Sequence, residues 1–278
     1  MMTATDDGDT DLTFIHLTDL HLLGTDDAQL NGQYPTQKLR TIIERIRAME
    51  IRPAFLLITG DLVNDGQPAE YETLNRCLPE LQSFDVPIIL GMGNHDARVF
   101  FRQIVLGEAN AEDPQPYYHS TLIDGVNIIM LDSQIPNKVP GFLGAEQLAW
   151  LAAELAKPVA VGHLIALHHP PVSSTVRLLD TMMLTNPQDL AAVVAGYDNV
   201  LGILSGHIHY NHVARFQQTF SFTTPAVLYT IDPGVQKNFR VLDGSGFAIG
   251  TIRHGELFMN TIMMTVGEKE LAYRRIEE

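Results

Sequence analysis

Short apolar runs alternate with longer amphipathic stretches along the first two thirds of the chain. A short apolar run bounded by turn-forming residues is typical of a buried strand, and apolar residues spaced three and four apart indicate a helix with one buried face. The pattern therefore predicts strands that alternate with helices. The predicted strands are residues 12–17, 54–59, 86–90, 126–131, 163–167 and 200–204, and the predicted helices are 36–50, 68–81, 100–106, 145–156 and 187–195.

The last third of the chain is rich in strand-like patterns instead. We predict strands at 222–229, 247–253 and 256–266, and a charged surface helix or a loose end at 268–278. Alternating strands and helices favour a parallel sheet with ligands at its carboxyl edge, and the later strands suggest a second sheet packed on the first. Residues 172–186 follow no clear period.

Composition is that of a soluble globular protein. Of the 278 residues, 45% are hydrophobic and 18% are charged, which is enough for one large core. No Pro/Gly/Ser-rich linker divides the chain, so we expect a single domain over residues 1–278, with 172–195 as a candidate cap or oligomerisation segment. The single cysteine, Cys77, excludes an intrachain disulfide and fits a reducing compartment.

Charge and hydropathy narrow the range of partners. The acidic N-terminus lacks the basic and apolar regions of a secretory signal, and no apolar run approaches the ~20 residues that span a bilayer. We therefore expect a cytoplasmic protein that does not enter membranes. The formal net charge of −15 disfavours nucleic-acid polymers and anionic membranes as partners. It allows a small phosphorylated substrate, because bound metal ions override the overall charge locally.

Five short loops, each directly after a predicted strand, carry side chains that can bind a metal. Alone, each has an ordinary explanation: Gly-Asp is common in turns, Asp-x-His on surfaces and Asn-His-Asp at helix caps. Because parallel strands end at one edge of a sheet, the five loops together predict a metal centre. The loops are Asp19-Leu20-His21, Gly60-Asp61, Gly93-Asn94-His95, His168-His169 and Gly206-His207-Ile208-His209.

The donor types favour first-row transition metals. Carboxylate and imidazole together suit Mn, Fe, Co and Zn. Residues two apart on an extended backbone point to the same side, so Asp19 and His21 would face one ion together, and His207 and His209 repeat this spacing. The carboxylate of Asp61 can bridge two ions. Two ions about 3.5–4 Å apart can activate a bridging hydroxide for in-line attack on a phosphoryl group.

This ordered series of motifs resembles the calcineurin-like metallophosphoesterases over residues 12–210. Within that superfamily, the chain is most similar to the class III cyclic-nucleotide phosphodiesterases and the related bacterial glycerophosphodiesterases. The stretches that carry this similarity are Gly60-Asp61-Leu62-Val63-Asn64-Asp65-Gly66, His168-His169-Pro170-Pro171 and Gly206-His207-Ile208-His209-Tyr210.

The resemblance implies an α/β fold: a four-layer α/β/β/α sandwich of two mixed sheets flanked by helices, the metallo-dependent phosphatase fold. It implies two divalent or trivalent ions (Fe, Mn, Zn or Co) and, because relatives are commonly dimers, a homodimer. The implied ligands are Asp19, His21 and His209 for the first ion, Asn94, His168 and His207 for the second, and Asp61 as the bridge.

The resemblance also implies residues that act on the substrate. His95 and the bridging Asp61 are the catalytic candidates, and His95 would stabilise charge or protonate the leaving oxygen without binding metal. Of the two adjacent histidines, His168 is the implied ligand because the family places it two positions before the first proline. We expect His16 in the core or behind the ligands, and Asp132 among the residues that support them. The candidate substrate contacts are Asn94, His95, His209, His169, Asn64 and Tyr210.

These residues predict a dinuclear metal-dependent phosphodiesterase, in which a metal-bridging hydroxide attacks small diesters of the cyclic-nucleotide or glycerophosphodiester type. Two alternatives stay open. A phosphomonoesterase of the same fold is disfavoured, because Asn64 stands where purple acid phosphatases carry tyrosine, and Asn64-Asp65-Gly66 stands where Ser/Thr phosphatases carry Asp-Arg-Gly. A catalytically silent metal-binding scaffold would usually lack a ligand or the histidine after the asparagine, and this chain has both.

Overall fold

The first β-sheet joins the N-terminal strands to two strands from late in the chain. In spatial order it contains β13 (Glu256–Met263), β12 (Gly246–Arg253), β1 (Leu12–Leu17), β2 (Phe55–Ile58) and β3 (Ile88–Leu90). β1, β2 and β3 are parallel, β12 is antiparallel to β1, and β13 is antiparallel to β12. This computed structural model describes residues 11–108, 115–264 and 270–275.

The second sheet is built from the middle of the chain. In spatial order it contains β4 (His119–Ile123), β5 (Val126–Met130), β6 (Gly162–Ala166), β7 (Val200–Ser205), β9 (Thr219–Thr223) and β8 (His212–Phe216). Its four inner strands are parallel, whereas β4 and β8 are antiparallel edge strands. A small third sheet contains β10 (Thr230–Ile231), β11 (Asn238–Leu242) and β14 (Glu270–Arg275).

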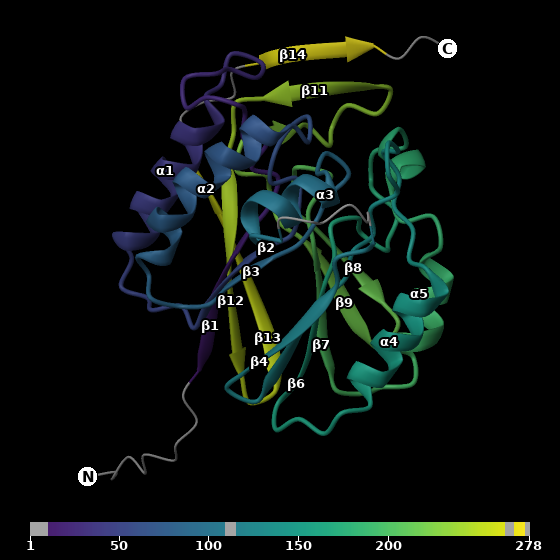
Figure 1. Cartoon of the computed structure of the whole chain (residues 1–278). Helices are drawn as coiled ribbons and strands as arrows, with labels where there is room; N and C mark the ends of the chain where they lie inside the picture. Colours follow the sequence, from purple (N-terminus) through teal and green to yellow (C-terminus); the bar gives the residue numbers. More distant parts are fainter. Residues whose placement is uncertain (1–10, 109–114, 265–269, 276–278) are drawn as a thin grey trace, which may run out of the picture.

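Helices cover the outer face of each large sheet (Figure 1). α1 (Pro35–Arg47) and α2 (Pro68–Gln82) pack on the first sheet, and α4 (Ala145–Leu155) and α5 (Pro187–Val194) pack on the second. α3 (Arg98–Phe100) continues into the π-helical turn η1 (Phe101–Val105), and η2 (Leu179–Met182) is a 3-10 turn. In the view of Figure 1, β11 and β14 lie above the large sheets.

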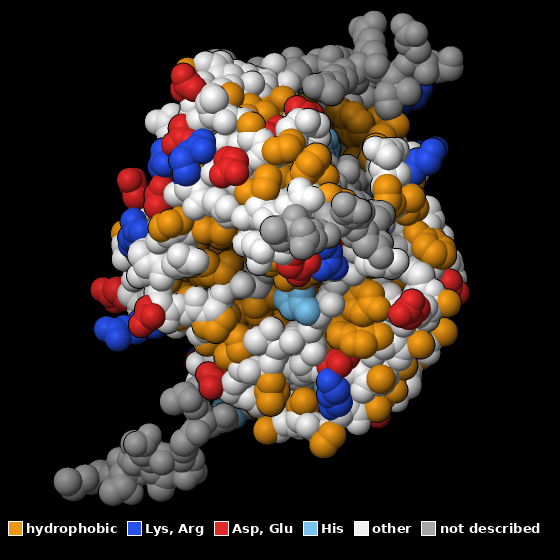
Figure 2. Space-filling view, in the orientation of Figure 1, with side chains coloured by type: hydrophobic (Ala, Val, Ile, Leu, Met, Phe, Trp, Pro, Cys, Tyr) orange, Lys and Arg blue, Asp and Glu red, His pale blue; other side chains and the backbone are white. Residues whose placement is uncertain are grey.

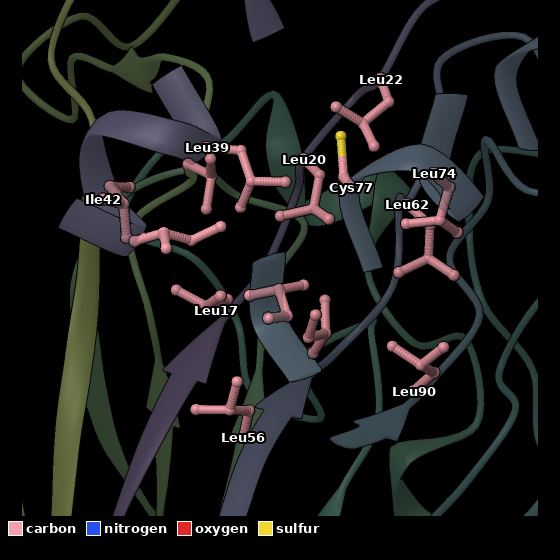
Figure 3. Close-up of a cluster of buried hydrophobic side chains, with 14 of the residues drawn as sticks. Leu17, Leu20, Leu22, Leu39, Ile42, Leu56, Leu62, Leu74, Cys77 and Leu90 are labelled. Atoms are coloured by element: carbon pink, nitrogen blue, oxygen red, sulfur yellow. The ribbon is translucent and has the colours of Figure 1, made fainter. Parts of the chain in front are cut away.

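Strand alternation divides the core into layers. On β1, Ile15 packs toward the helices, whereas Phe14 packs between the two large sheets and stacks on Phe55 with ring centroids 4.7 Å apart. Figure 3 shows part of the first helical layer, including Leu39 of α1 and Leu74 of α2 beside strand residues. These layers confirm the predicted four-layer α/β/β/α sandwich with two mixed sheets. The single-domain assignment stays a prediction.

The strands late in the chain were predicted only in part. They do not form a separate second sheet, because β12 and β13 return to complete the first sheet beside β1. The predicted strand 222–229 is wrong beyond Thr223, where β9 ends. Residues 225–228 are buried and apolar like a strand, but the backbone N–H groups of Val227 and Leu228 donate to the carbonyls of Thr18 and Asp19. They line the end of β1 instead of joining a ladder.

Other predictions fail at polar or charged segments. The predicted helix or loose end over 268–278 is wrong for residues 270–275, which form β14, and 268–269 and 276–278 lie outside the described residues. β4, β8 and β11 were not predicted, because polar and charged residues interrupt their apolar runs. The loop expected at 108–115 falls largely on residues 109–114, which also lie outside the described part of the chain.

The segment 172–195 is not one unit. Its second half contains α5, whose Leu190 and Val194 belong to the core beneath the second sheet. Most of its first half packs separately, with Leu179 and Met183 against Ile208 and Tyr210, although Val172 and Leu184 join the core beneath the second sheet. The part that reaches the predicted metal loops is therefore residues 172–186.

Acidic and basic side chains are interspersed on the face shown in Figure 2. The net charge of −15 is thus compatible with local ion pairing, as in the contact of Arg40 with Asp26 and Glu80. None of the helices within the described residues has the length and apolarity needed to cross a bilayer.

Candidate metal centre

The carboxyl ends of five parallel strands bring the predicted donors together. β1 leads to Asp19 and His21, β2 to Asp61 and β3 to Asn94, while β6 and β7 lead to the histidines of the second sheet. Four sets of three donors, drawn from both sheets, each have their ligand atoms within 4.8 Å of one another. These sets are Asp19/His21/His209, Asp19/Asp61/His168, His21/Asp61/His95 and His168/His169/His207.

One half of the centre consists of Asp19, His21 and His209. The Nε2 atom of His209 lies 3.3 Å from Nε2 of His21 and 3.3 Å from Oδ1 of Asp19. Two nitrogen or oxygen ligands of one ion, each bound at 2.0–2.1 Å, lie about 3.0–3.4 Å apart. Both distances from His209 fall in this range, whereas Nε2 of His21 and Oδ1 of Asp19 are 4.0 Å apart, close to the separation of two ligands on opposite sides of one ion. The three donors are therefore compatible with a single divalent ion.

The other half centres on His168. Its Nε2 atom lies 3.2 Å from Oδ1 of Asn94 and 3.3 Å from Oδ2 of Asp61. A ring nitrogen of His207 lies within 4.8 Å of a ring nitrogen of His168, and the two rings meet edge to face with centroids 5.0 Å apart. Asp61 also approaches the first half, since Oδ2 is 3.7 Å from Nε2 of His21.

Backbone carbonyls fix the orientation of these imidazoles. A carbonyl only accepts, so each contacting ring nitrogen carries the proton, and the opposite nitrogen is left as a donor to metal. This arrangement is typical of metal-binding histidines. The N–H donors and their acceptors are Nδ1 of His168 to Thr59 (2.9 Å), Nε2 of His207 to Met182 (2.8 Å) and Nδ1 of His209 to Tyr229 (3.0 Å).

The backbone of the ligand loops is left-handed, not extended as the two-residue spacing suggested. The φ angles are 54° at Asp19, 46° at His21, 48° at Asp61, 74° at His207 and 62° at His209. A non-glycine residue rarely adopts positive φ, and such residues gather at functional sites. The expectation that an extended backbone points both side chains of each pair toward the metal is therefore wrong. A sharp turn after each strand orients them instead.

Burial and charge make the cluster attractive to cations. Burial favours the neutral acid, but the neighbouring His209 and His168 hold the pKa of Asp19 well below its usual value, and His168 and His95 do the same for Asp61. Burial lowers the pKa of His21 and of His207 to about 3. Two ionised carboxylates beside neutral imidazoles form a donor set that bound cations would neutralise.

The pKa of His168 is shifted in the opposite direction, because the carboxylates of Asp61 and Asp19 both face its ring. Burial alone would lower the pKa of His168, but Asp61 and Asp19 raise it to about 9. His95 is shifted in the same direction: burial is outweighed by the Asp61 carboxylate and the Asn64 carbonyl, which raise its pKa. In the absence of a cation, protonated histidine thus takes the counterion role.

The two adjacent histidines have different surroundings. His169 is fully buried, and its ring nitrogens contact Oγ of Ser133 at 2.8 Å and the carbonyl of Val139 at 2.9 Å. Both nitrogens are thus engaged away from Asp61, whereas His168 faces it. The geometry supports His168 as the ligand and sets His169 behind it, although its nitrogens come close enough to His168 and His207 to complete a three-donor set.

The other substrate candidates lie at different depths. His95 is exposed. Its backbone N–H donates to Oδ1 of Asp61 at 2.9 Å, and its ring Nδ1–H donates to the carbonyl of Asn64. Tyr210 is 6% exposed, and its hydroxyl lies 2.7 Å from Oγ of Ser174. His95 and Asn64 are therefore placed at the open side, while Tyr210 anchors residues 172–186.

Several supporting residues escaped the sequence analysis. The Asp96 carboxylate accepts backbone N–H groups from Gly93 and Leu62, which ties the two loops together, and burial raises its pKa to about 7. Asp96 is part of the Asn-His-Asp motif, but its role in joining the two loops is seen only from its hydrogen bonds in the structure. Tyr229 and Met182 contribute carbonyl groups, and no side-chain pattern can reveal these.

Gly206 approaches the first ligand loop too closely for any side chain. A Cβ atom there would lie 1.8 Å from Oγ1 of Thr18 and 2.5 Å from Oδ2 of Asp19. We expect Gly206→Ala to displace His207, whose N–H donates to Asp19, and to lower metal-dependent turnover on the order of 100-fold. Gly196→Ala is the control, because its nearest contact would be an ordinary 3.6 Å. Equal rates for both variants would contradict this expectation.

Comparison with known proteins agrees with the motif series. The family model described as calcineurin-like phosphoesterase matches residues 12–211. A cAMP/cGMP dual specificity phosphodiesterase of Mycobacterium tuberculosis is 35% identical over 223 residues, which cover 80% of this chain and 69% of that protein. A glycerophosphodiester phosphodiesterase of Enterobacter lignolyticus is 27% identical over 196 residues, which cover 68% of each chain.

Solved structures share the fold. A dimetal phosphatase from Danio rerio superposes with a TM-score of 0.64 at 16% sequence identity, over 89% of this chain and 98% of that chain. The resemblance predicted from the motifs is thus confirmed by the sequence matches, and the fold by the structural match.

Proposed function

Because the chain belongs to the calcineurin-like phosphoesterase family, we propose that it hydrolyses small phosphodiesters with two divalent metal ions held at the candidate metal centre. The observation that carries the proposal is the position of Asp61 between two donor clusters. Its Oδ2 atom lies 3.3 Å from Nε2 of His168 and 3.7 Å from Nε2 of His21. A carboxylate in this position can bind both ions at once as a bridging ligand.

Each cluster has its own set of donors. Asp19, His21 and His209 would hold the first ion, and Asn94, His168 and His207 the second. Ions bound there would lower the pKa of water to supply a nucleophile and would neutralise the charge of the phosphate. Because backbone carbonyls already orient His168, His207 and His209, the donors need little rearrangement when substrate binds.

His95 would act on the substrate. Its Nδ1–H donates to the Asn64 carbonyl and its backbone N–H donates to Asp61, so the imidazole is tied to the loop that carries the shared carboxylate. The side chain is exposed beside His21, with ring centroids 4.8 Å apart. With Nδ1 anchored, Nε2 is the atom that would stabilise the phosphate or give a proton to the leaving ester oxygen.

The proposed substrates are diesters of the cyclic-nucleotide or glycerophosphodiester type. Relatives named for each of these activities match most of the chain. Asn64 and Asp65-Gly66 replace the residues typical of two monoesterase groups, which also favours a diesterase.

Purified protein loaded with Mn²⁺ or Co²⁺ should hydrolyse bis-p-nitrophenyl phosphate faster than p-nitrophenyl phosphate. Removal of metal by a chelator should abolish the rate, and added metal should restore it. A panel of 3′,5′-cAMP, 2′,3′-cAMP and glycerophosphodiesters then identifies the substrate class. A faster monoester rate would indicate a phosphomonoesterase, and bound metal without turnover of any diester would indicate a silent scaffold.

A further inference from the structure

His21 lacks the hydrogen bond that orients the other histidines of the centre. In those histidines, the ring nitrogen that faces away from the donor cluster donates to a backbone carbonyl. Nδ1 of His21 is buried and has no hydrogen-bond partner within the described residues. The anchored histidines and their acceptors are His95 with Asn64, His168 with Thr59, His207 with Met182 and His209 with Tyr229. Something else must hold the His21 ring.

Aromatic rings surround His21 instead. The Tyr229 ring lies nearly parallel to it, with an interplanar angle of 14° and a centroid distance of 6.0 Å. The same Tyr229 ring packs closely on His209, at 4.6 Å and 30°. His95 meets His21 edge to face at 4.8 Å. Among the described residues, Tyr229 is therefore the one non-histidine ring that contacts both imidazoles of the first half.

The backbone holds Tyr229 firmly at this place. Val227 N–H donates to the Thr18 carbonyl at 3.0 Å, and Leu228 N–H approaches the Asp19 carbonyl at 3.4 Å. The segment that ends at Tyr229 is thus fastened to the segment that carries Asp19. A ring fixed in this way can limit the tilt of the imidazoles beneath it, because parallel aromatic rings resist rotation out of their stacked arrangement.

We propose that Tyr229 is a positioning residue of the first metal half, whose ring aligns His21 in place of the missing hydrogen bond and whose carbonyl aligns His209. The inference rests on the proposed two-ion function. The carbonyl remains whatever side chain stands at 229, so substitutions isolate the contribution of the ring. Tyr229→Phe keeps the ring and its stacking on His21 and His209, so it should lose much less metal affinity than variants without the ring.

Metal binding tests the proposal without relying on turnover. Metal-free protein is titrated with Co²⁺, and binding is followed by calorimetry and by the visible absorption of the bound ion. In Tyr229→Leu and Tyr229→Ala we expect one of two binding events to weaken about tenfold, which is the effect of losing a group that orients a ligand. The other event should stay unchanged, and saturating Co²⁺ should restore most of the turnover.

Tyr118→Ala is the matched control, because this half-buried tyrosine packs on Trp150 at 4.8 Å, away from the donors. Its Co²⁺ titration should equal that of the natural protein, and thermal melting should show that each variant is folded. Unchanged affinities in both Tyr229→Leu and Tyr229→Ala would overturn the proposal, as would an equal loss in Tyr229→Phe. Absence of two binding events in the natural protein would overturn the proposed function instead.

Discussion

Asp61→Asn is expected to lower kcat/KM for bis-p-nitrophenyl phosphate by about 1,000-fold or more, since loss of several kcal/mol of charge stabilisation corresponds to at least three powers of ten. Asp61 is buried and faces both donor clusters through one oxygen, while its other oxygen accepts the His95 N–H. Asparagine keeps the shape of the side chain but removes the charge that would hold two cations together.

The backbone should tolerate this change. Asp61 has a φ angle of 48°, and asparagine enters the left-handed region more readily than most residues. Asp85→Asn is a matched control, because Asp85 has a φ angle of 57° but is exposed on the surface. Its rate and its metal content should not change. An Asp61→Asn protein that keeps two bound ions and a tenth of the rate would contradict the assignment of Asp61 as the shared ligand.

The location of the centre could be predicted because the strand topology largely determines where the ligand loops lie. Parallel strands carry the residues that follow them to one edge of their sheet, and the packing of the two sheets places the edge that carries Asp19 beside the edge that carries His209. The Nε2 atom of His209 indeed lies 3.3 Å from Oδ1 of Asp19. Apolar runs locate such strands well, because both faces of an inner parallel strand are buried.

The details inside the loops could not be predicted in the same way. Positive φ at Asp19 and His207 depends on the tight packing of loop against loop, where Gly206 leaves no room for a side chain. Met182 and Tyr229 orient ligands through carbonyl groups, which every residue has. The apolar run at 225–228 was wrongly predicted as a strand for a related reason. Its residues are apolar because they are buried, but the N–H groups of Val227 and Leu228 donate to the segment that carries Asp19.

The support beneath the second half of the centre depends on one buried ion pair. Arg98 donates through Nε to Oδ2 of Asp132 at 2.7 Å and through a terminal nitrogen to Oδ1 at 3.0 Å. The carbonyl of Gln134 accepts from the same guanidinium, and its side-chain amide donates to the Gly93 carbonyl. The pair therefore fastens the loop after β3 to the end of β5, and it agrees with the expected supporting role of Asp132.

We expect Arg98→Met to reduce the free energy of unfolding by about 3–5 kcal/mol, because it leaves the Asp132 carboxylate buried without its partner. Denaturant unfolding of metal-free protein measures this, since bound ions would otherwise add to the stability of the folded state. The side chains of this pair are 6% and 0% exposed. Water can therefore do little to replace the lost charge.

The pair of Arg253 and Asp11 offers the comparison, since it has a similar two-point contact at the surface, with side chains 55% and 34% exposed. Arg253→Met should leave the unfolding midpoint unchanged within error, because solvent screens both charges already. Similar losses of unfolding free energy in the two variants would mean that the loss comes from removing an arginine side chain and not from leaving a buried carboxylate unpaired. If Arg98→Met is as stable as the natural protein but binds the ion of the Asn94 half more weakly, the pair positions the loop after β3 and contributes little to the stability of the fold.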